Sequence, residues 1–141
     1  NPENDAGRLM LITRMGADAV REALPRLIEA VEDSGRRVAW VCDPMHGNTT
    51  TAGNGRKTRP FESVLAELEA VFDAHRSAGS RLAGVHFELT GEAVTECTGG
   101  AQALGAHDLE TNYESYCDPR LNYAQSMEMA FLISRFLRSE R

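Results

Sequence analysis

The sequence lacks several features that would assign it to a particular class of protein. It has no run of about 18 consecutive apolar residues, the length that crosses a bilayer, so no membrane partner is expected. Positive charge is scarce, because 21 acidic residues outnumber 15 basic ones and leave a net charge of −6. Nucleic acid is therefore not expected as a partner, although a local basic pocket could still bind a small anion.

Cysteine is also rare, with three residues among 141, an odd number and far below that of a disulfide scaffold. We therefore expect a reducing, cytoplasmic location. Cys42, Cys97 and Cys117 are expected to be small buried residues and not nucleophiles or ligands. No signal-peptide pattern follows Asn1, and the absence of an initial Met leads us to expect that the natural start lies elsewhere.

The sequence does contain a repeated order of strand, loop and helix. The expected strands lie at 8–14, 37–42 and 82–89, and the expected helices at 17–33, from Pro60 onward, and at 122–137. Alternating strands and helices indicate an α/β fold with a parallel sheet. Three such units leave both edges of the sheet open, so the chain is either a small three-layer sandwich or part of something larger. A full (β/α)₈ barrel takes roughly 200 residues or more, which is longer than this chain.

Polar residues collect where the expected strands end. Arg14 follows the first strand, His46 lies in the loop after the second, and Glu88 is near the end of the third. Asp118 comes later, in the long irregular segment 91–120. The carboxyl ends of parallel strands are where ligands bind in α/β folds, so these side chains should converge. One imidazole and two carboxylates suit Mn²⁺, Fe²⁺, Co²⁺ or Zn²⁺.

Each of these residues also has a simpler interpretation. A lone histidine in a loop, such as His46, is usually solvated. An inward glutamate such as Glu88 more often pairs with an arginine than with a metal, and Asp118-Pro119 is typical of a turn. Spacing alone leaves both the metal site and these alternatives open.

The segment 43–59 is rich in Gly, Asn and Thr and carries a local basic cluster of Arg56, Lys57 and Arg59. It is expected to be a loop, and its cations favour an anionic small molecule. It matches no phosphate-loop motif, so a solvated loop remains the alternative. His75 is expected at the surface and Trp40 in the core.

The segment 42–49 (CDPMHGNT) resembles the class II (plant-like) 3-deoxy-D-arabino-heptulosonate 7-phosphate (DAHP) synthases, the first enzymes of the shikimate pathway. Further similar segments follow in order along the chain, at 11–16, 57–59, 86–91, 94–97, 117–122 and 125–128. The resemblance therefore covers nearly the whole sequence. It implies a (β/α)₈ TIM barrel of which residues 1–141 supply the C-terminal part, about strands six to eight with their helices.

The resemblance also implies an activity and roles for individual residues. The family condenses phosphoenolpyruvate with erythrose 4-phosphate, releases phosphate and uses a divalent metal such as Mn²⁺ or Co²⁺. His46, Glu88 and Asp118 resemble three of the four metal ligands. Arg14 resembles a residue that binds phosphoenolpyruvate, and Lys57 one that binds the aldehyde phosphate; His46, Lys57 and Arg14 are the expected catalytic residues.

The fourth ligand of the family is a cysteine in the N-terminal half, and none of the cysteines here matches its motif. The N-terminal half of the same enzyme is therefore an implied partner. The resemblance also implies a homo-oligomer. Two alternatives stay open. One is a secondary-metabolism homologue, for phenazines or for the aminoDAHP of the ansamycin route. The other is a fragment without catalytic activity when taken alone.

Overall fold

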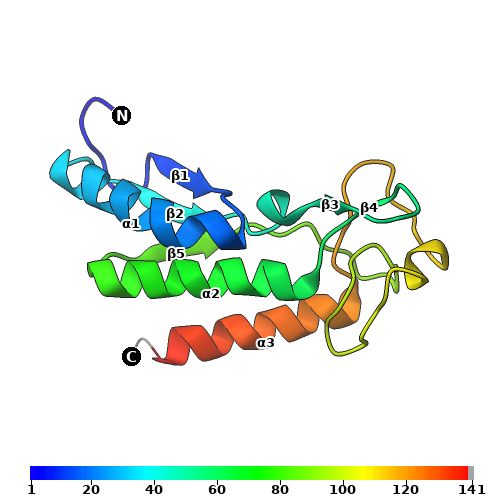
Figure 1. Cartoon of the computed structure of the whole chain (residues 1–141). Coiled ribbons are helices and arrows are strands. Elements are labelled where there is room, and N and C mark those ends of the chain that lie inside the picture. The colour runs from blue at the N-terminus through cyan, green and yellow to red at the C-terminus, as the bar shows by residue number, and fades with distance from the viewer. Residues whose placement is uncertain (140–141) are drawn as a thin grey trace.

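The computed structural model of the chain describes residues 1–139 and consists of one small parallel sheet, its helices and two long connections (Figure 1). The elements in order are β1 (Met10–Thr13), α1 (Ala17–Asp33), β2 (Ala39–Cys42), the 3₁₀ helix η1 (His46–Asn48), β3 (Thr50–Thr51), β4 (Lys57–Thr58), α2 (Phe61–Ala78), β5 (Leu82–Val85), the 3₁₀ helix η2 (Asp108–Glu110) and α3 (Tyr123–Ser139). β1, β2 and β5 form a parallel sheet in the order β1-β2-β5, which confirms the expected α/β class.

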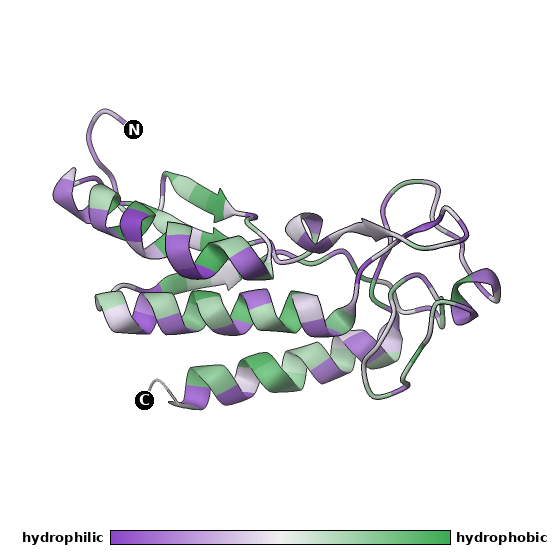
Figure 2. Ribbon diagram, viewed as in Figure 1, coloured by the Kyte–Doolittle hydropathy of each residue, from purple (hydrophilic) through white to green (hydrophobic). Residues whose placement is uncertain are grey.

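The hydrophobic core lies between the sheet and the helices. Its fully buried members come from α1, α2 and β2 and include Val20, Leu24, Ile28, Val64, Leu68, Val71, Trp40 and Cys42. Figure 2 shows β1 as mainly hydrophobic and the helices as mixed, as expected for helices with one buried face. The predicted burial of Trp40 is confirmed at 3% exposure.

The expected range of the first helix and the expected start of the second at Pro60 are confirmed. α1 covers the predicted range and ends before Gly35, and α2 begins after Pro60 and ends at Gly79. Gly79 has φ 68°, the left-handed conformation that closes a helix at little cost only for glycine.

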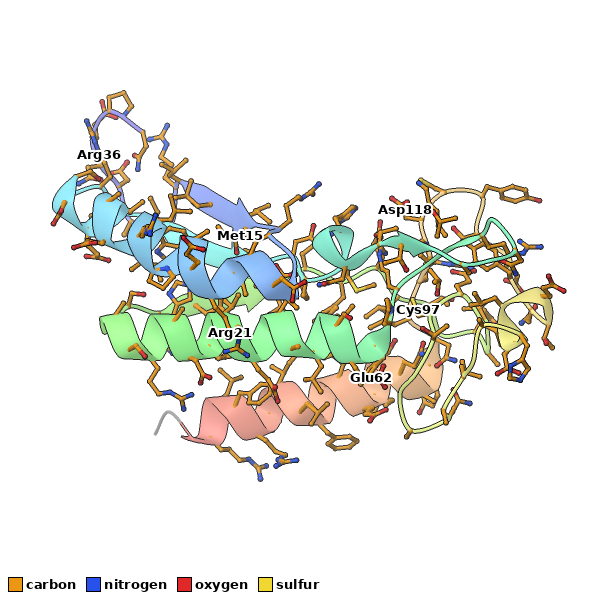
Figure 3. The ribbon with its side chains drawn as sticks, viewed as in Figure 1. Met15, Arg21, Arg36, Glu62, Cys97 and Asp118 are labelled. Carbon is orange, nitrogen blue, oxygen red and sulfur yellow. The ribbon has the colours of Figure 1, made fainter. Side chains whose placement is uncertain are left out.

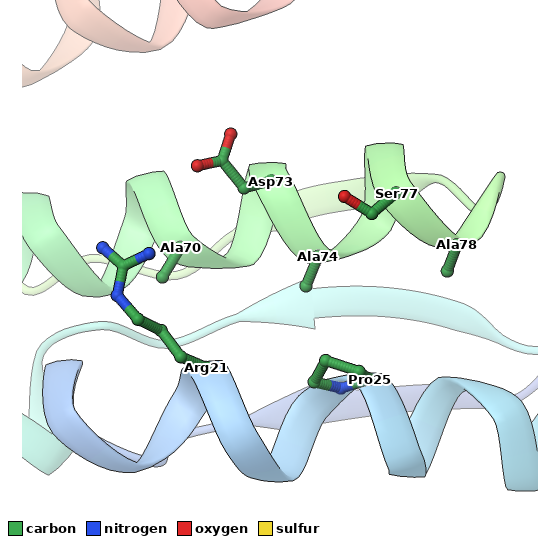
Figure 4. A pocket seen from close by; sticks show the side chains of 7 residues that line it. All are labelled: Arg21, Pro25, Ala70, Asp73, Ala74, Ser77 and Ala78. Atoms are coloured by element: carbon green, nitrogen blue, oxygen red, sulfur yellow. The ribbon is translucent and has the colours of Figure 1, made fainter.

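Small residues let α1 and α2 lie side by side (Figure 4). A groove of about 350 Å³ runs between them, with Ala70 and Ala74 along α2 and Arg21 and Pro25 on α1. The groove follows the helices and does not include any of the polar residues expected at the strand ends. Within residues 1–139, none of the helices is both long enough and apolar enough to span a bilayer.

The third strand is shorter than predicted, since β5 ends at Val85 and not at Leu89. The register between β2 and β5 shifts at Trp40/Val41, and Ala83 in β5 is exposed. The chain then continues in extended form, with His86 N–H donating to the Cys42 carbonyl at 2.8 Å. Leu89 forms a single bridge to Leu121 and is 55% exposed.

Three further expectations are wrong. The segment 43–59 is more than a loop, because β3 and β4 pair as a short antiparallel hairpin. His75 is 2% exposed, because it continues the buried stripe of α2 and its ring packs edge-on against Trp40. Cys117 is exposed, because it lies in the irregular segment outside the core.

Candidate metal and substrate site

Three potential metal ligands converge beyond the carboxyl ends of the strands, where Figure 3 places Asp118. His46 lies in η1 after β2, Glu88 follows β5, and Asp118 lies in the segment before α3. The His46 Nε2 atom is 3.7 Å from Glu88 Oε1 and 3.9 Å from Asp118 Oδ2. One ligand atom from each residue lies within 4.8 Å of the others. The predicted convergence is confirmed, whereas the role of these residues as ligands stays a prediction.

Each carboxylate uses one oxygen for a cationic side chain and turns the other toward His46. Glu88 Oε2 pairs with Arg59, and Asp118 Oδ1 accepts a hydrogen bond from Lys57 Nζ at 3.0 Å. The alternative that Glu88 pairs with an arginine is therefore correct, but it leaves Oε1 available. Both of these oxygens lie too far from His46 Nε2 for a hydrogen bond, although the three residues each place one ligand atom within 4.8 Å of the others.

The spacing of these atoms fits a shared cation. Ligands at about 2.1 Å from one metal ion and at a tetrahedral angle lie roughly 3.4 Å apart. The observed separations of 3.7 and 3.9 Å need only a small contraction to reach that value. Imidazole with carboxylates is a donor set for Mn²⁺, Fe²⁺, Co²⁺ or Zn²⁺, so the residues present fit the metal that the sequence predicts.

A buried carboxylate that sequence analysis missed orients His46. Asp43 is 0% exposed, and its Oδ2 lies 2.7 Å from His46 Nδ1. Its Oδ1 accepts the backbone N–H groups of Met45 and His46. In the neutral imidazole this places the proton on Nδ1 and the lone pair on Nε2, which faces Glu88 and Asp118. The position three residues before His46, typical of a turn-forming Asp, was the available signal.

Arg14 adjoins the same carboxylate from the end of β1. Its Nη2 lies 3.2 Å from Asp43 Oδ2, and its side chain is 57% exposed. A guanidinium that is half-exposed beside Asp43 retains donors for an anion. The His86 ring also lies near, stacked against that of His46 with the ring centroids 6.2 Å apart.

The charge balance keeps the proposed ligand carboxylate ionised. The hydrogen bond from Lys57 lowers the pKa of Asp118, and the same bond raises the pKa of Lys57.

The buried thiols behave differently, because burial raises the pKa of Cys97 to about 12 and raises that of Cys42 further. Both remain protonated at neutral pH, which supports the expectation that neither acts as a ligand or nucleophile.

Arg59, which the sequence placed only in a basic cluster, has a buried role at the site. It is 0% exposed and donates to the Pro119 carbonyl at 2.6 Å and to Thr49 Oγ1 at 2.8 Å, in addition to its pairing with Glu88. It therefore holds one proposed ligand and the backbone beside the other. No spacing signal marks a buried arginine, and the three cations expected as one basic cluster have different partners, since Arg56 lies over the Tyr113 ring.

Comparison with known families decides what this arrangement belongs to. The model of the class-II DAHP synthetase family matches residues 1–134. The chain belongs to this family. Its membership confirms the resemblance drawn from the CDPMHGNT segment and the motifs around it.

The curated members of the class-II DAHP synthetase family that match are much longer than this chain. A phospho-2-dehydro-3-deoxyheptonate aldolase of Streptomyces coelicolor is 50% identical over 140 residues, covering 99% of this chain and 31% of the relative. Relatives of the same name from Mycolicibacterium smegmatis and Neurospora crassa are each 50% identical and are each covered over 30% of their length. The chain thus spans less than a third of the proteins that it matches.

Proposed function

We propose that this chain is the C-terminal part of a metal-dependent DAHP synthase and supplies three of its metal ligands. The observation that carries the proposal is the convergence of His46 Nε2 with one oxygen each of Glu88 and Asp118, at 3.7 and 3.9 Å. The names of the family and of the relatives support the reaction, the condensation of phosphoenolpyruvate with erythrose 4-phosphate. "The complete barrel" below means this chain together with the part of the family sequence that it lacks.

The uncovered surface of the sheet supports a larger (β/α)₈ barrel. The helices cover one face of the sheet (Figure 1), whereas Met10 and Ile12 point to the other face and are 54% and 52% exposed. Parallel sheets are normally buried on both faces. β1 and β5 each have only one strand partner among the described residues, so both edges can accept further strands. Closure into a barrel would bury Met10, Ile12 and both edges.

The chemistry follows from what each side chain can hold. A divalent cation bound here would supply Lewis acidity toward the aldehyde oxygen of erythrose 4-phosphate. Arg14, half-exposed beside Asp43, would bind the carboxylate or phosphate of phosphoenolpyruvate. Lys57, 56% exposed, keeps ammonium donors beyond its bond to Asp118 for the phosphate of the aldehyde substrate. Holding two anionic substrates at reacting distance is the main contribution of these cations.

The test is phosphate release from phosphoenolpyruvate, measured with and without erythrose 4-phosphate and with added Mn²⁺ or Co²⁺. We expect the complete barrel to release phosphate only when both the aldehyde and the metal are present. We expect the 141-residue chain alone to be inactive, because it lacks the cysteine ligand that the family carries elsewhere. Turnover by this chain alone, or activity that survives chelation of metal, would contradict the proposal.

A further inference from the structure

A buried carboxylate on α2 joins the two loops that carry the proposed site. Glu67 is 0% exposed. Its Oε1 accepts the N–H of Met15 at 3.0 Å, and its Oε2 accepts the side-chain amide of Asn48 at 2.7 Å. Met15 directly follows Arg14. Asn48 comes two residues after His46. One side chain, outside the proposed ligand set, therefore bonds both loops.

Asn48 extends this connection into the surrounding backbone. Its Nδ2 also donates to the Pro44 carbonyl at 2.8 Å, and its Oδ1 accepts the N–H of Ala17 at the start of α1 at 3.3 Å. The loops are also in direct contact, since a Cβ atom added to Gly47 would lie 2.4 Å from the Gly16 nitrogen. Such close packing favours a single position of one loop relative to the other. The hydrogen bonds to Glu67 then keep the two loops in that position.

Core packing alone does not explain a charge at position 67. Burial raises the pKa of Glu67, opposed by hydrogen bonds from Met15, Gly16 and Asn48, so an ionised group here is costly to bury. An aliphatic residue would fill the same place in α2 without that cost. A carboxylate suits this position because it only accepts hydrogen bonds, and both loops direct N–H groups toward it.

We propose that Glu67 is a positioning residue that fixes Arg14 relative to His46, so that the metal and phosphoenolpyruvate bind to one preset arrangement. The inference rests on the proposed function. It assigns to Glu67 no contact with substrate or metal. Its action is through the Met15 and Asn48 bonds alone.

The experiment compares Glu67→Gln with Glu69→Gln in the complete barrel. The Glu67→Gln variant presents an NH₂ group to a loop that needs an acceptor there. Glu69→Gln is the control, because Glu69 is exposed on the same helix and its replacement removes an equal charge. Mn²⁺ affinity is measured by electron paramagnetic resonance without substrates, and the KM for phosphoenolpyruvate is measured separately. We expect Glu67→Gln to weaken Mn²⁺ binding about tenfold and to raise this KM, as displaced outer partners of metal ligands do. Glu69→Gln should match the wild type.

A second comparison separates positioning from general destabilisation. Leu68→Ala removes a fully buried side chain beside Glu67 and weakens the core, but it removes neither of the hydrogen bonds that Glu67 accepts from the loops. It should bind Mn²⁺ as the wild type does at temperatures where it is folded. Equal Mn²⁺ affinity of Glu67→Gln and wild type, or an equal loss in Leu68→Ala, would overturn the positioning role.

If Glu67→Gln does not fold, Asn48→Ala tests the same connection from the other side. It removes the bond to the His46 loop but leaves the Met15 bond, so Mn²⁺ binding should weaken more than phosphoenolpyruvate binding. Wild-type Mn²⁺ affinity in Asn48→Ala would overturn the inference. Failure of the wild-type barrel itself to bind Mn²⁺ would instead contradict the proposed function.

Discussion

At the scale of single residues, Asp43 links the proposed substrate and metal sites, because its Oδ2 lies close to both Arg14 and His46. In Asp43→Asn an NH₂ group replaces that oxygen and faces the Nδ1 proton. The imidazole then favours the other tautomer, with its proton on Nε2. We expect Mn²⁺ affinity of the complete barrel to fall about 10- to 100-fold, measured by spin-resonance titration.

The matched control for this prediction is Asp33→Asn, which removes the same charge from an exposed position at the end of α1. It should leave Mn²⁺ affinity unchanged. Asp43→Asn with wild-type affinity would show that Asp43 does not set the tautomer of His46.

His75 gives a prediction on pH and stability. Burial lowers its pKa from the usual 6.5, so the folded protein binds this proton less readily than the unfolded chain. The stability that neutral His75 contributes is therefore fully present above about pH 6.5 and is lost as the pH falls below it. Relative to His75→Gln, the complete barrel should lose about 1 kcal/mol of unfolding free energy between pH 7.5 and 5.5.

Urea unfolding at the two pH values measures this difference, with His107→Gln as the control because His107 is exposed. A wild-type advantage over His75→Gln that stays constant across this range would mean that His75 is not buried as described.

At the scale of elements, the close approach of the β1 and β2 loops explains why position 47 is glycine. A methyl group on Gly47 would lie 2.4 Å from the Gly16 nitrogen. The atoms that it would meet belong to the backbone of Gly16 and Met15, which cannot rotate away as a side chain can. Gly47→Ala should therefore destabilise the complete barrel by about 2 kcal/mol in denaturant unfolding, as overpacking does. Gly53→Ala is the control, because nothing lies within 4 Å of its added Cβ. Equal stability of the two variants would contradict this packing.

Helices were predictable from the sequence because their signals are local. Apolar spacing located α1, and Pro60 located the start of α2, to within a residue or two. The same stripe, extended by one turn, would have marked His75 as buried. The end of β5 was not predictable, because it depends on a register shift against β2, and the hairpin β3–β4 has two residues in each strand, too few to show alternation.

The residues of the site also differ in how far the sequence predicts them. His46 and Glu88 were predictable because each lies at or just beyond the end of a strand, and parallel strands end together. Arg59 and Glu67 were not, because their importance comes from being buried charges with several partners. Burial of that kind depends on segments distant in sequence, such as Glu67 with Met15.

At the scale of the whole molecule, the described residues include apolar surfaces on α3 and on β1 that nothing covers. α3 exposes Tyr123, Met127 and Phe131 at helical spacing, to 60%, 40% and 67%. β1 exposes Met10 and Ile12 on the face of the sheet that the helices do not cover. Apolar surfaces of this kind mark contacts with further polypeptide, which agrees with a chain that spans 30–31% of its relatives.

Crystals of the complete barrel grown with Mn²⁺ would test the proposed ligand set by anomalous scattering. We expect one strong peak about 2.0–2.3 Å from His46 Nε2 and from one oxygen each of Glu88 and Asp118. The Glu88 Oε2 and Asp118 Oδ1 atoms should remain with Arg59 and Lys57. A Mn²⁺ peak in contact with none of His46, Glu88 and Asp118 would contradict the assignment of the site. The absence of any peak in crystals of an active enzyme would contradict it as well.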